Sequence, residues 1–270
     1  MTAGSARPPR IGEEDGQPMA AAERDRFTSP VIAAARFVAQ RMILKPVVWT
    51  VTKVTVLGKT ELTDLKGAFV VVANHTSHLD APLIFGALPR RLARYLAAGA
   101  AADYFFDVRW RRGLTALFFN AFAVDRSGVG PRGVSAKSLL RRGIPLIVFP
   151  EGTRSRDGSL GTFKPGAAAL AAGAEVPCVP VAIIGASIAH PRGSKWPGPG
   201  RLPVGVVFGE PMHAEPGEAP TAYITRVRAE VARLTDEHSA RILAQGPTHG
   251  QADRPSGDSA GSAESGQGQR

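Results

Sequence analysis

The chain has 270 residues, enough for one large domain or two small ones, and we expect one. Hydrophobic residues make up 44% and charged residues 21%, which excludes a wholly disordered chain and a protein with many membrane spans. The single cysteine, Cys178, excludes an internal disulfide and a thiolate zinc cage, and its apolar neighbours predict a small buried side chain.

The formal charge of +10 is concentrated in the middle of the chain. Residues 1–29 and residues 246–270 each carry one more acid than base, so the region between them holds a surplus of twelve positive charges. Such a region attracts nucleic acid, an anionic bilayer or phosphorylated small molecules, although a solvated basic surface would have the same composition.

Both ends of the chain are predicted to be disordered tails, residues 1–29 and 246–270, because they are rich in Gly, Ser, Pro, Ala and Gln. The domain is expected to span residues 30–245. No apolar segment follows a basic start, and no stretch reaches the ~18 apolar residues of a membrane-spanning helix, so we expect a cytosolic protein.

Residues 30–50 are predicted to contain an amphipathic helix. On a helical wheel, seven apolar residues from Val31 to Ile43 share one arc, and Arg36, Gln40, Arg41 and Lys45 lie on the other half. A cationic polar face suits a helix at a bilayer interface, where basic side chains reach lipid phosphates. A helix that covers the core is the alternative.

The rest of the domain alternates short apolar runs with helical stretches, which predicts an α/β fold with a central, mostly parallel or mixed sheet flanked by helices. The strands are expected at Val54 to Leu57, Ala68 to Ala73, Tyr95 to Ala98, Phe122 to Asp125, Ile144 to Phe149, Cys178 to Ile184 and Val204 to Phe208. The helices are expected at Ala81 to Ala87, Ala100 to Phe119, Pro131 to Arg142, Pro165 to Ala174 and Thr221 to Ala244.

The first candidate site follows the strand that ends at Ala73. His75 is the second residue after this strand and Asp80 lies five residues further on, across one turn that Thr76 or Ser77 would cap. A carboxylate that binds one ring nitrogen fixes the tautomer and leaves the other nitrogen as a proton acceptor. This spacing favours a general-base pair. A capping histidine, or a metal site formed with His78, would fit the same residues.

The second candidate site follows the strand that ends at Phe149. Gly152 lets backbone approach a ligand, Thr153 offers a hydroxyl, and Arg154 offers a planar fork for phosphate oxygens. Glu151 would repel a phosphate, so we interpret it as a brace that orients the loop. The loop lacks the lysine of a nucleotide-binding P-loop.

Two more basic residues stand at similar places. Arg126 follows the strand that begins at Phe122, and Lys164 precedes a predicted helix whose N-terminus favours anions.

Together these segments resemble the 1-acylglycerol-3-phosphate (lysophosphatidic acid) acyltransferases, a family of glycerolipid acyltransferases, from Val54 to Gly209. The motifs appear in order: Asn-His-x-x-x-x-Asp (74–80), a strand ending in Arg126, Phe-Pro-Glu-Gly-Thr-Arg-Ser (149–155) and Val-Pro-x-x-Pro-Val (176–181). One departure is Asn120, where the second block of the family often begins with glycine.

The resemblance implies an acyltransferase in which His75 is the base and Asp80 orients it. Arg126, Lys164 and the loop Glu151, Gly152, Thr153 and Arg154 would then surround the phosphate of a lysophospholipid acceptor. An acyl-coenzyme A or acyl carrier protein would donate the acyl group, with no other cofactor and no metal. A lipid acceptor implies peripheral attachment to the anionic, cytoplasmic face of the cell membrane.

Two alternatives remain. A relative of the same family would use glycerol 3-phosphate, another lysophospholipid or a glycolipid, and a non-enzymatic alternative is a basic membrane-surface protein. Nucleic acid is not an expected partner, because aromatic residues amount to only 7% of the chain.

Overall fold

The structure is a computed structural model, and it describes residues 27–101, 117–124 and 135–246. Within these ranges, seven strands form one sheet in the order β1-β7-β6-β2-β5-β3-β4. Their bounds are β1 (Lys53–Leu57), β2 (Val70–Ala73), β3 (Ala97–Ala101), β4 (Phe122–Val124), β5 (Leu146–Val148), β6 (Cys178–Ile184) and β7 (Pro203–Phe208).

Neighbouring strands are parallel except β6 and β7, so the sheet is mixed but mostly parallel, as predicted. Strands β2 and β6 are buried along their whole lengths, which their uninterrupted apolar sequences predict for the centre of a sheet. Because β2 lies between β5 and β6, the carboxyl ends of these three strands meet at one edge of the sheet.

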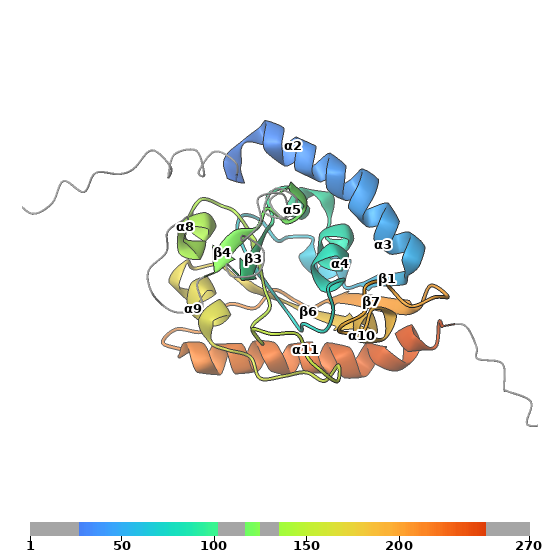
Figure 1. Cartoon of the computed structure of the whole chain (residues 1–270). Coiled ribbons are helices and arrows are strands. Elements are labelled where there is room, and N and C mark those ends of the chain that lie inside the picture. Colours follow the sequence, from blue (N-terminus) through green and yellow to red (C-terminus); the bar gives the residue numbers. More distant parts are fainter. Residues whose placement is uncertain (1–26, 102–116, 125–134, 247–270) are drawn as a thin grey trace, which may run out of the picture.

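Helices cover both faces of the sheet and enclose one hydrophobic core on each side (Figure 1). Val71 and Ala73 of β2 point into one core, and Val70 and Val72 point into the other. The helices are α2 (Pro30–Ala39), η1 (Gln40–Leu44), α3 (Lys45–Val51), η2 (Lys59–Leu62), α4 (Asp80–Ala87), α5 (Arg90–Ala93), α8 (Ala136–Arg141), α9 (Gly166–Gly173), α10 (Ala186–Ala189) and α11 (Pro220–Leu243).

The elements α2, η1 and α3 form one long helix along the side of the domain (Figure 1). It begins at the Ser29 cap, whose side chain accepts from the Ile32 N–H, and η1 is a π-helical turn within it. The predicted helix is therefore present. Phe27, which was predicted to lie in the N-terminal tail, is only 1% exposed and packs into a core.

The apolar arc of this helix faces outward. Val31 is 75% exposed, Met42 71% and Val38 57%, whereas Arg36 is 1% exposed. The polar side contacts the protein instead: Gln40 Nε2 donates to the Phe118 carbonyl, and the Arg41 guanidinium donates to the carbonyls at the end of α4. The expectation that the cationic face would meet lipid phosphates is therefore wrong for these side chains.

One prediction of secondary structure is wrong and several boundaries shift. The helix expected from Ala100 to Phe119 begins in a strand, because β3 extends through Ala101 to pair with β4 and β5. Alanine favours helix in isolation, but pairing in the sheet overrides that preference. The last residues of this expected helix, 117–119, are helical, and residues 102–116 lie outside the described ranges. Asp125, at the end of the strand expected from Phe122, and residues 131–134, at the start of the helix expected from Pro131, also lie outside them.

Candidate active site

His75 and Asp80 are in contact at the carboxyl end of β2. His75 follows the strand by two residues and Asp80 is the first residue of α4, so the intervening turn brings the side chains together. The distance from His75 Nδ1 to Asp80 Oδ2 is 2.8 Å, and the side chain of Asp80 is fully buried while that of His75 is 23% exposed. One ring nitrogen is therefore bound to the carboxylate, and the ring edge reaches solvent.

Asp80 also organises the turn that carries the histidine. The backbone N–H groups of Thr76 and Ser77 donate to the same Oδ2, at 2.6 and 2.9 Å. The turn was expected to be capped by Thr76 or Ser77, and Ser77 Oγ accepts from the Leu79 N–H at 3.3 Å. The N-cap position of α4 itself is Leu79, which has no side-chain cap.

Asn74 fixes the chain where β2 ends. Its side-chain amide exchanges two hydrogen bonds with the backbone of Ile183 on β6, at 2.7 and 2.8 Å. The side chain thus continues the pairing between the two strands for one more step. The motif contained Asn74, but no role could be read from the sequence, because the partner lies 109 residues away.

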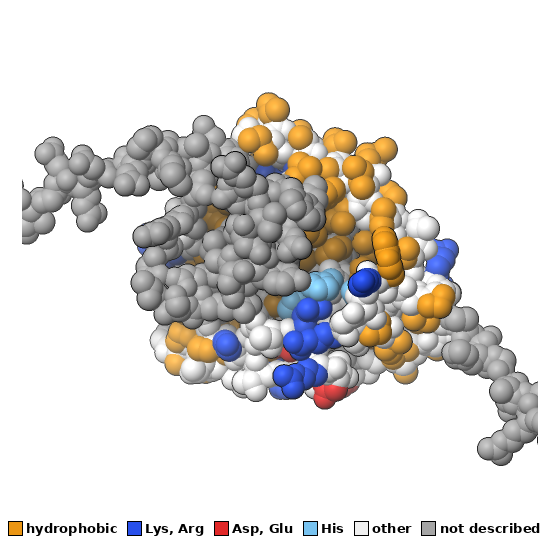
Figure 2. All heavy atoms as spheres, viewed as in Figure 1, with side chains coloured by type: hydrophobic (Ala, Val, Ile, Leu, Met, Phe, Trp, Pro, Cys, Tyr) orange, Lys and Arg blue, Asp and Glu red, His pale blue; other side chains and the backbone are white. Residues whose placement is uncertain are grey.

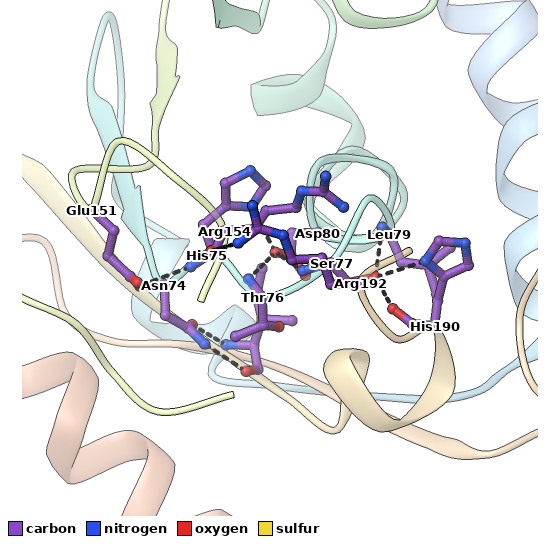
Figure 3. A network of polar contacts seen from close by, with 11 residues as sticks. Asn74, His75, Thr76, Ser77, Leu79, Asp80, Glu151, Arg154, His190 and Arg192 are labelled. Carbon is purple, nitrogen blue, oxygen red and sulfur yellow. Dashed lines mark hydrogen bonds and ion pairs between the residues drawn. The ribbon is translucent and has the colours of Figure 1, made fainter. Parts of the chain in front are cut away.

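The loop after β5 binds the histidine turn from the other side (Figure 3). The ring of Phe149 stacks on His75 with centroids 4.1 Å apart. Glu151 Oε1 accepts from the His75 N–H at 3.0 Å. The N–H of Ser155 donates to the His75 carbonyl at 2.8 Å. Both backbone groups of His75 are therefore bound by the loop that contains the second motif.

Glu151 points toward the histidine turn and contacts it through the His75 N–H. Burial raises the pKa of Glu151, and hydrogen bonds from the backbone of His75 and Gly161 offset part of that effect. Gly161 leaves the space this side chain needs, since a Cβ there would lie 2.9 Å from Glu151 Oε2.

The remaining residues of the loop lie around its exposed side. Gly152 has φ +77°, a conformation that favours glycine, and a Cβ there would lie 3.1 Å from Lys164 Nζ. Thr153 and Lys164 are exposed. Within the described residues, one buried nitrogen of Arg154, Nη1, has no hydrogen-bond partner. Arg126 lies outside the described ranges.

Two residues outside the motifs join this site. Arg192 Nη1 donates to the Arg154 carbonyl at 3.1 Å, and the hydroxyl of Ser77 donates to the His190 carbonyl at 2.9 Å (Figure 3). Both come from the segment after β6, which lies beside β2 in the sheet. The sequence pattern did not predict that His190 and Arg192 lie near His75, because their proximity depends on β6 being the neighbour of β2 in the sheet.

His78 lies beside the pair but does not bind Asp80. Burial lowers the pKa of His78, and the positive charges of Arg154, His190 and His75 lower it further. Within the part of the chain that the structure describes, no group of three His, Cys, Asp or Glu side chains could hold a metal ion.

Comparison with known proteins identifies relatives of this arrangement. A family model described as Acyltransferase matches residues 53–184. The chain is 42% identical over 108 residues to the 1-acyl-sn-glycerol-3-phosphate acyltransferase of Pseudomonas aeruginosa, covering 37% of this chain and 39% of that protein. It is 35% identical over 122 residues to the human alpha form, covering 42% and 39%. These matches span less than half the length of the curated relatives.

A solved structure is similar over a larger share of the chain. The 1-acyl-sn-glycerophosphate acyltransferase of Thermotoga maritima superposes with a TM-score of 0.59 and 26% sequence identity, covering 84% of this chain and 83% of that one. The family model covers all the motifs, and this structure extends the similarity to most of the chain. Residues 53–184 therefore match the acyltransferase family, and the relatives named here are 1-acylglycerol-3-phosphate acyltransferases.

Proposed function

We propose that the protein transfers a fatty acyl group from an acyl thioester to the free hydroxyl of 1-acyl-sn-glycerol 3-phosphate, giving phosphatidic acid for phospholipid biosynthesis. The observation that carries the proposal is the contact of 2.8 Å between His75 Nδ1 and Asp80 Oδ2, near Arg154, whose buried Nη1 has no hydrogen-bond partner among the described residues. The choice of 1-acyl-sn-glycerol 3-phosphate as the acceptor is inferred from the names of the relatives described above.

In this proposal His75 is the general base. Asp80 holds the proton on Nδ1, so Nε2 has a free lone pair that accepts the proton of the acceptor hydroxyl. The hydroxyl oxygen then bonds to the thioester carbonyl carbon, the carbon–sulfur bond breaks, and the imidazolium returns its proton to the leaving thiolate. The buried carboxylate stabilises the imidazolium between these steps.

The acceptor phosphate binds at the loop after β5. Arg154 is the principal contact, because its Nη1 is buried without a partner among the described residues, and burying such a donor is costly unless a ligand satisfies it. Lys164 lies against Gly152 and supplies a second positive charge. Arg126 completes the phosphate contacts in this proposal, as the sequence resemblance implies.

The donor is acyl-coenzyme A or an acyl carrier protein. A thioester carbonyl is already activated, so positioning and a base suffice, and the proposed reaction uses no metal and no further cofactor.

The proposed location is the cytoplasmic face of the cell membrane, with peripheral attachment to anionic lipid. None of the described helices is long and apolar enough to cross a bilayer. Hydrophobic side chains gather along the outer side of the α2-η1-α3 helix, at the rim of the face that carries the histidines (Figure 2). An outward apolar face can insert at the boundary of headgroups and acyl chains, where the acceptor lies.

The test is a product assay with purified full-length protein. Acyl-coenzyme A and acyl carrier protein thioesters are offered with lysophosphatidic acid, glycerol 3-phosphate, lysophosphatidylcholine and a glycolipid, and products are identified by mass. The proposal expects phosphatidic acid as the main product. A preference for another acceptor would place the enzyme elsewhere in the family, and no acyl transfer at all would leave a membrane-surface binding protein.

A further inference from the structure

The segment between α10 and β7 carries an exposed tryptophan among positive charges. Residues 191–201 read Pro-Arg-Gly-Ser-Lys-Trp-Pro-Gly-Pro-Gly-Arg, with three basic residues and no acid. Trp196 is 81% exposed, and Arg192, Lys195 and Arg201 are exposed as well. An exposed tryptophan among three cations is a combination that suits the boundary between lipid and water, because its ring is apolar and its N–H can reach polar groups.

Hydrogen bonds at both ends hold this loop in place. The N–H of Gly198 donates to the Ala189 carbonyl at 2.7 Å, and the N–H of Ser194 donates to the Pro191 carbonyl at 3.1 Å. Arg201 Nη2 donates to the Trp49 carbonyl near the end of α3, at 3.0 Å. The loop is thus tied at its base, and its tryptophan remains directed into solvent.

The same contacts place the loop between the active site and the amphipathic helix. Arg192 contacts the Arg154 carbonyl at the phosphate loop, and Arg201 contacts α3. Ile188 on α10, just before the loop, is 56% exposed. The loop therefore extends the exposed apolar surface of the helix toward the site.

We propose that residues 191–201, with Trp196 at their tip, form a second contact with an anionic bilayer surface. The proposal rests on the membrane-bound acyltransferase proposed above and assigns it a second point of attachment. Tryptophan suits the interface because its ring is apolar and its N–H can bind headgroups, and the three cations complement anionic lipid. Two separated contacts fix the orientation of a bound protein, whereas one helix leaves rotation about its own axis free.

A bilayer fits this loop better than a protein partner. Among the described residues, Trp196 is the only large exposed apolar side chain of the loop and Ile188 is the only one on α10, and these two bury far less area than a stable protein interface of ~1,200 Å² or more. The charge of the loop has one sign, which suits a continuous anionic surface.

Binding of full-length protein to vesicles tests the proposal. Vesicles of phosphatidylcholine with phosphatidylglycerol are titrated with the wild type, Trp196→Ala and Lys195→Ser, and Lys66→Ser is the matched control. Lys66 is an exposed lysine before β2, at the opposite edge of the sheet from the site. We expect Lys195→Ser to weaken binding about fivefold, Trp196→Ala at least as much, and Lys66→Ser hardly at all.

Tryptophan fluorescence tests the contact directly, even if no single variant lowers the affinity for vesicles. Vesicles should shift the emission of the wild type to shorter wavelength, and most of this shift should be absent in Trp196→Phe. Equal binding of all four proteins together with an unchanged shift in Trp196→Phe would overturn the proposal. So would a dimer in sedimentation that dissociates on Trp196→Ala, because the loop would then be an interface between two copies.

Activity on a detergent-dispersed acceptor distinguishes a failure of the loop to bind membranes from a failure of the proposed acyltransferase function. The loop variants should keep normal turnover there, since Trp196 and Lys195 do not contact the site. Loss of vesicle binding with normal detergent activity supports the second contact. An inactive wild type would contradict the acyltransferase function while the vesicle data still decide whether the loop binds a bilayer.

Discussion

At the scale of single residues, one carboxylate oxygen determines the geometry of the site. Asp80 Oδ2 accepts from His75 and from two backbone N–H groups, so it orients the ring and shapes the turn together. The spacing of five residues predicted the contact with the ring. It could not predict the two backbone bonds, because they depend on how the turn folds around the carboxylate.

Replacing His75 with Ala should reduce acyl transfer about 100- to 10,000-fold, because a positioned base contributes that much. Asp80→Asn should have an effect comparable or milder, since the base remains but its tautomer is no longer fixed. Steady-state kinetics of both variants and of the double variant check this. The double variant should be no slower than His75→Ala, because the two residues act as one unit; additive losses would argue for separate roles.

Replacing Arg154 with Ala should raise KM for a phosphorylated acceptor about 10- to 150-fold, the equivalent of a charge-assisted hydrogen bond of ~1.5 to 3 kcal/mol. KM for the acyl donor should change little. Arg156→Ala is the matched control, because Arg156 is an exposed arginine in the same loop. Lysine should substitute poorly at position 154 if the contact is bidentate. Equal acceptor KM in the Arg154 and Arg156 variants would remove Arg154 from the phosphate site.

His78 should affect stability below neutral pH more than it affects catalysis. The pKa of His78 is lowered from 6.5 in the folded state, chiefly by burial, so the unfolded chain binds the proton more readily. Stability therefore falls as the pH drops through 6.5. In His78→Gln the fall in Tm between neutral and mildly acidic pH should be smaller, with turnover retained. A Tm profile identical to that of the wild type would contradict the assignment.

At the scale of elements, the amphipathic helix shows the limit of a helical wheel. The sequence separates an apolar arc from a polar one but does not state which arc faces the protein. Here Gln40 and Arg41 satisfy carbonyls of neighbouring segments, and the apolar arc is left outside. Those carbonyls belong to segments distant in the sequence, so the orientation required the tertiary structure.

The accuracy of the predicted strand boundaries differed from strand to strand. Strand β6 was predicted with its exact ends, because its run from Cys178 to Ile184 is apolar throughout and buried. The strand expected at Tyr95 to Ala98 was predicted too early in the sequence, since β3 is Ala97–Ala101. Its small residues form a pattern that suits a helix as well as a strand. Asn120, which departs from the glycine that the resemblance led us to expect, has a φ of 49°, and asparagine tolerates this conformation better than most residues.

Replacing Val38, Met42 and Ile43 together with Ser should weaken vesicle binding and lower activity on bilayer substrate, with less effect on detergent-dispersed substrate. These side chains are 57%, 71% and 54% exposed, so the Tm should change little. Val48→Ser is the contrasting variant, since Val48 is 4% exposed and its replacement should destabilise the fold. Vesicle flotation and thermal unfolding check both. A large fall in Tm for the triple variant would place the arc in the core.

At the scale of the whole molecule, the site exists because the sheet brings distant segments together. The motifs after β2 and β5 adjoin because these strands are parallel neighbours, and the segment after β6 joins them from the other side. The sequence predicted that polar residues would collect at strand ends. It could not supply the strand order, and for that reason Arg192 and His190 were not predicted as neighbours of the site.

The most direct test of the central claim follows both products of the reaction at once. Purified protein is mixed with 1-acyl-sn-glycerol 3-phosphate and an acyl-coenzyme A in detergent, and phosphatidic acid is measured by mass while free thiol is measured by colour. The account predicts equal amounts of the two products from the wild type and almost none from a folded His75→Ala variant. Thiol released without phosphatidic acid, or full turnover in His75→Ala, would contradict it.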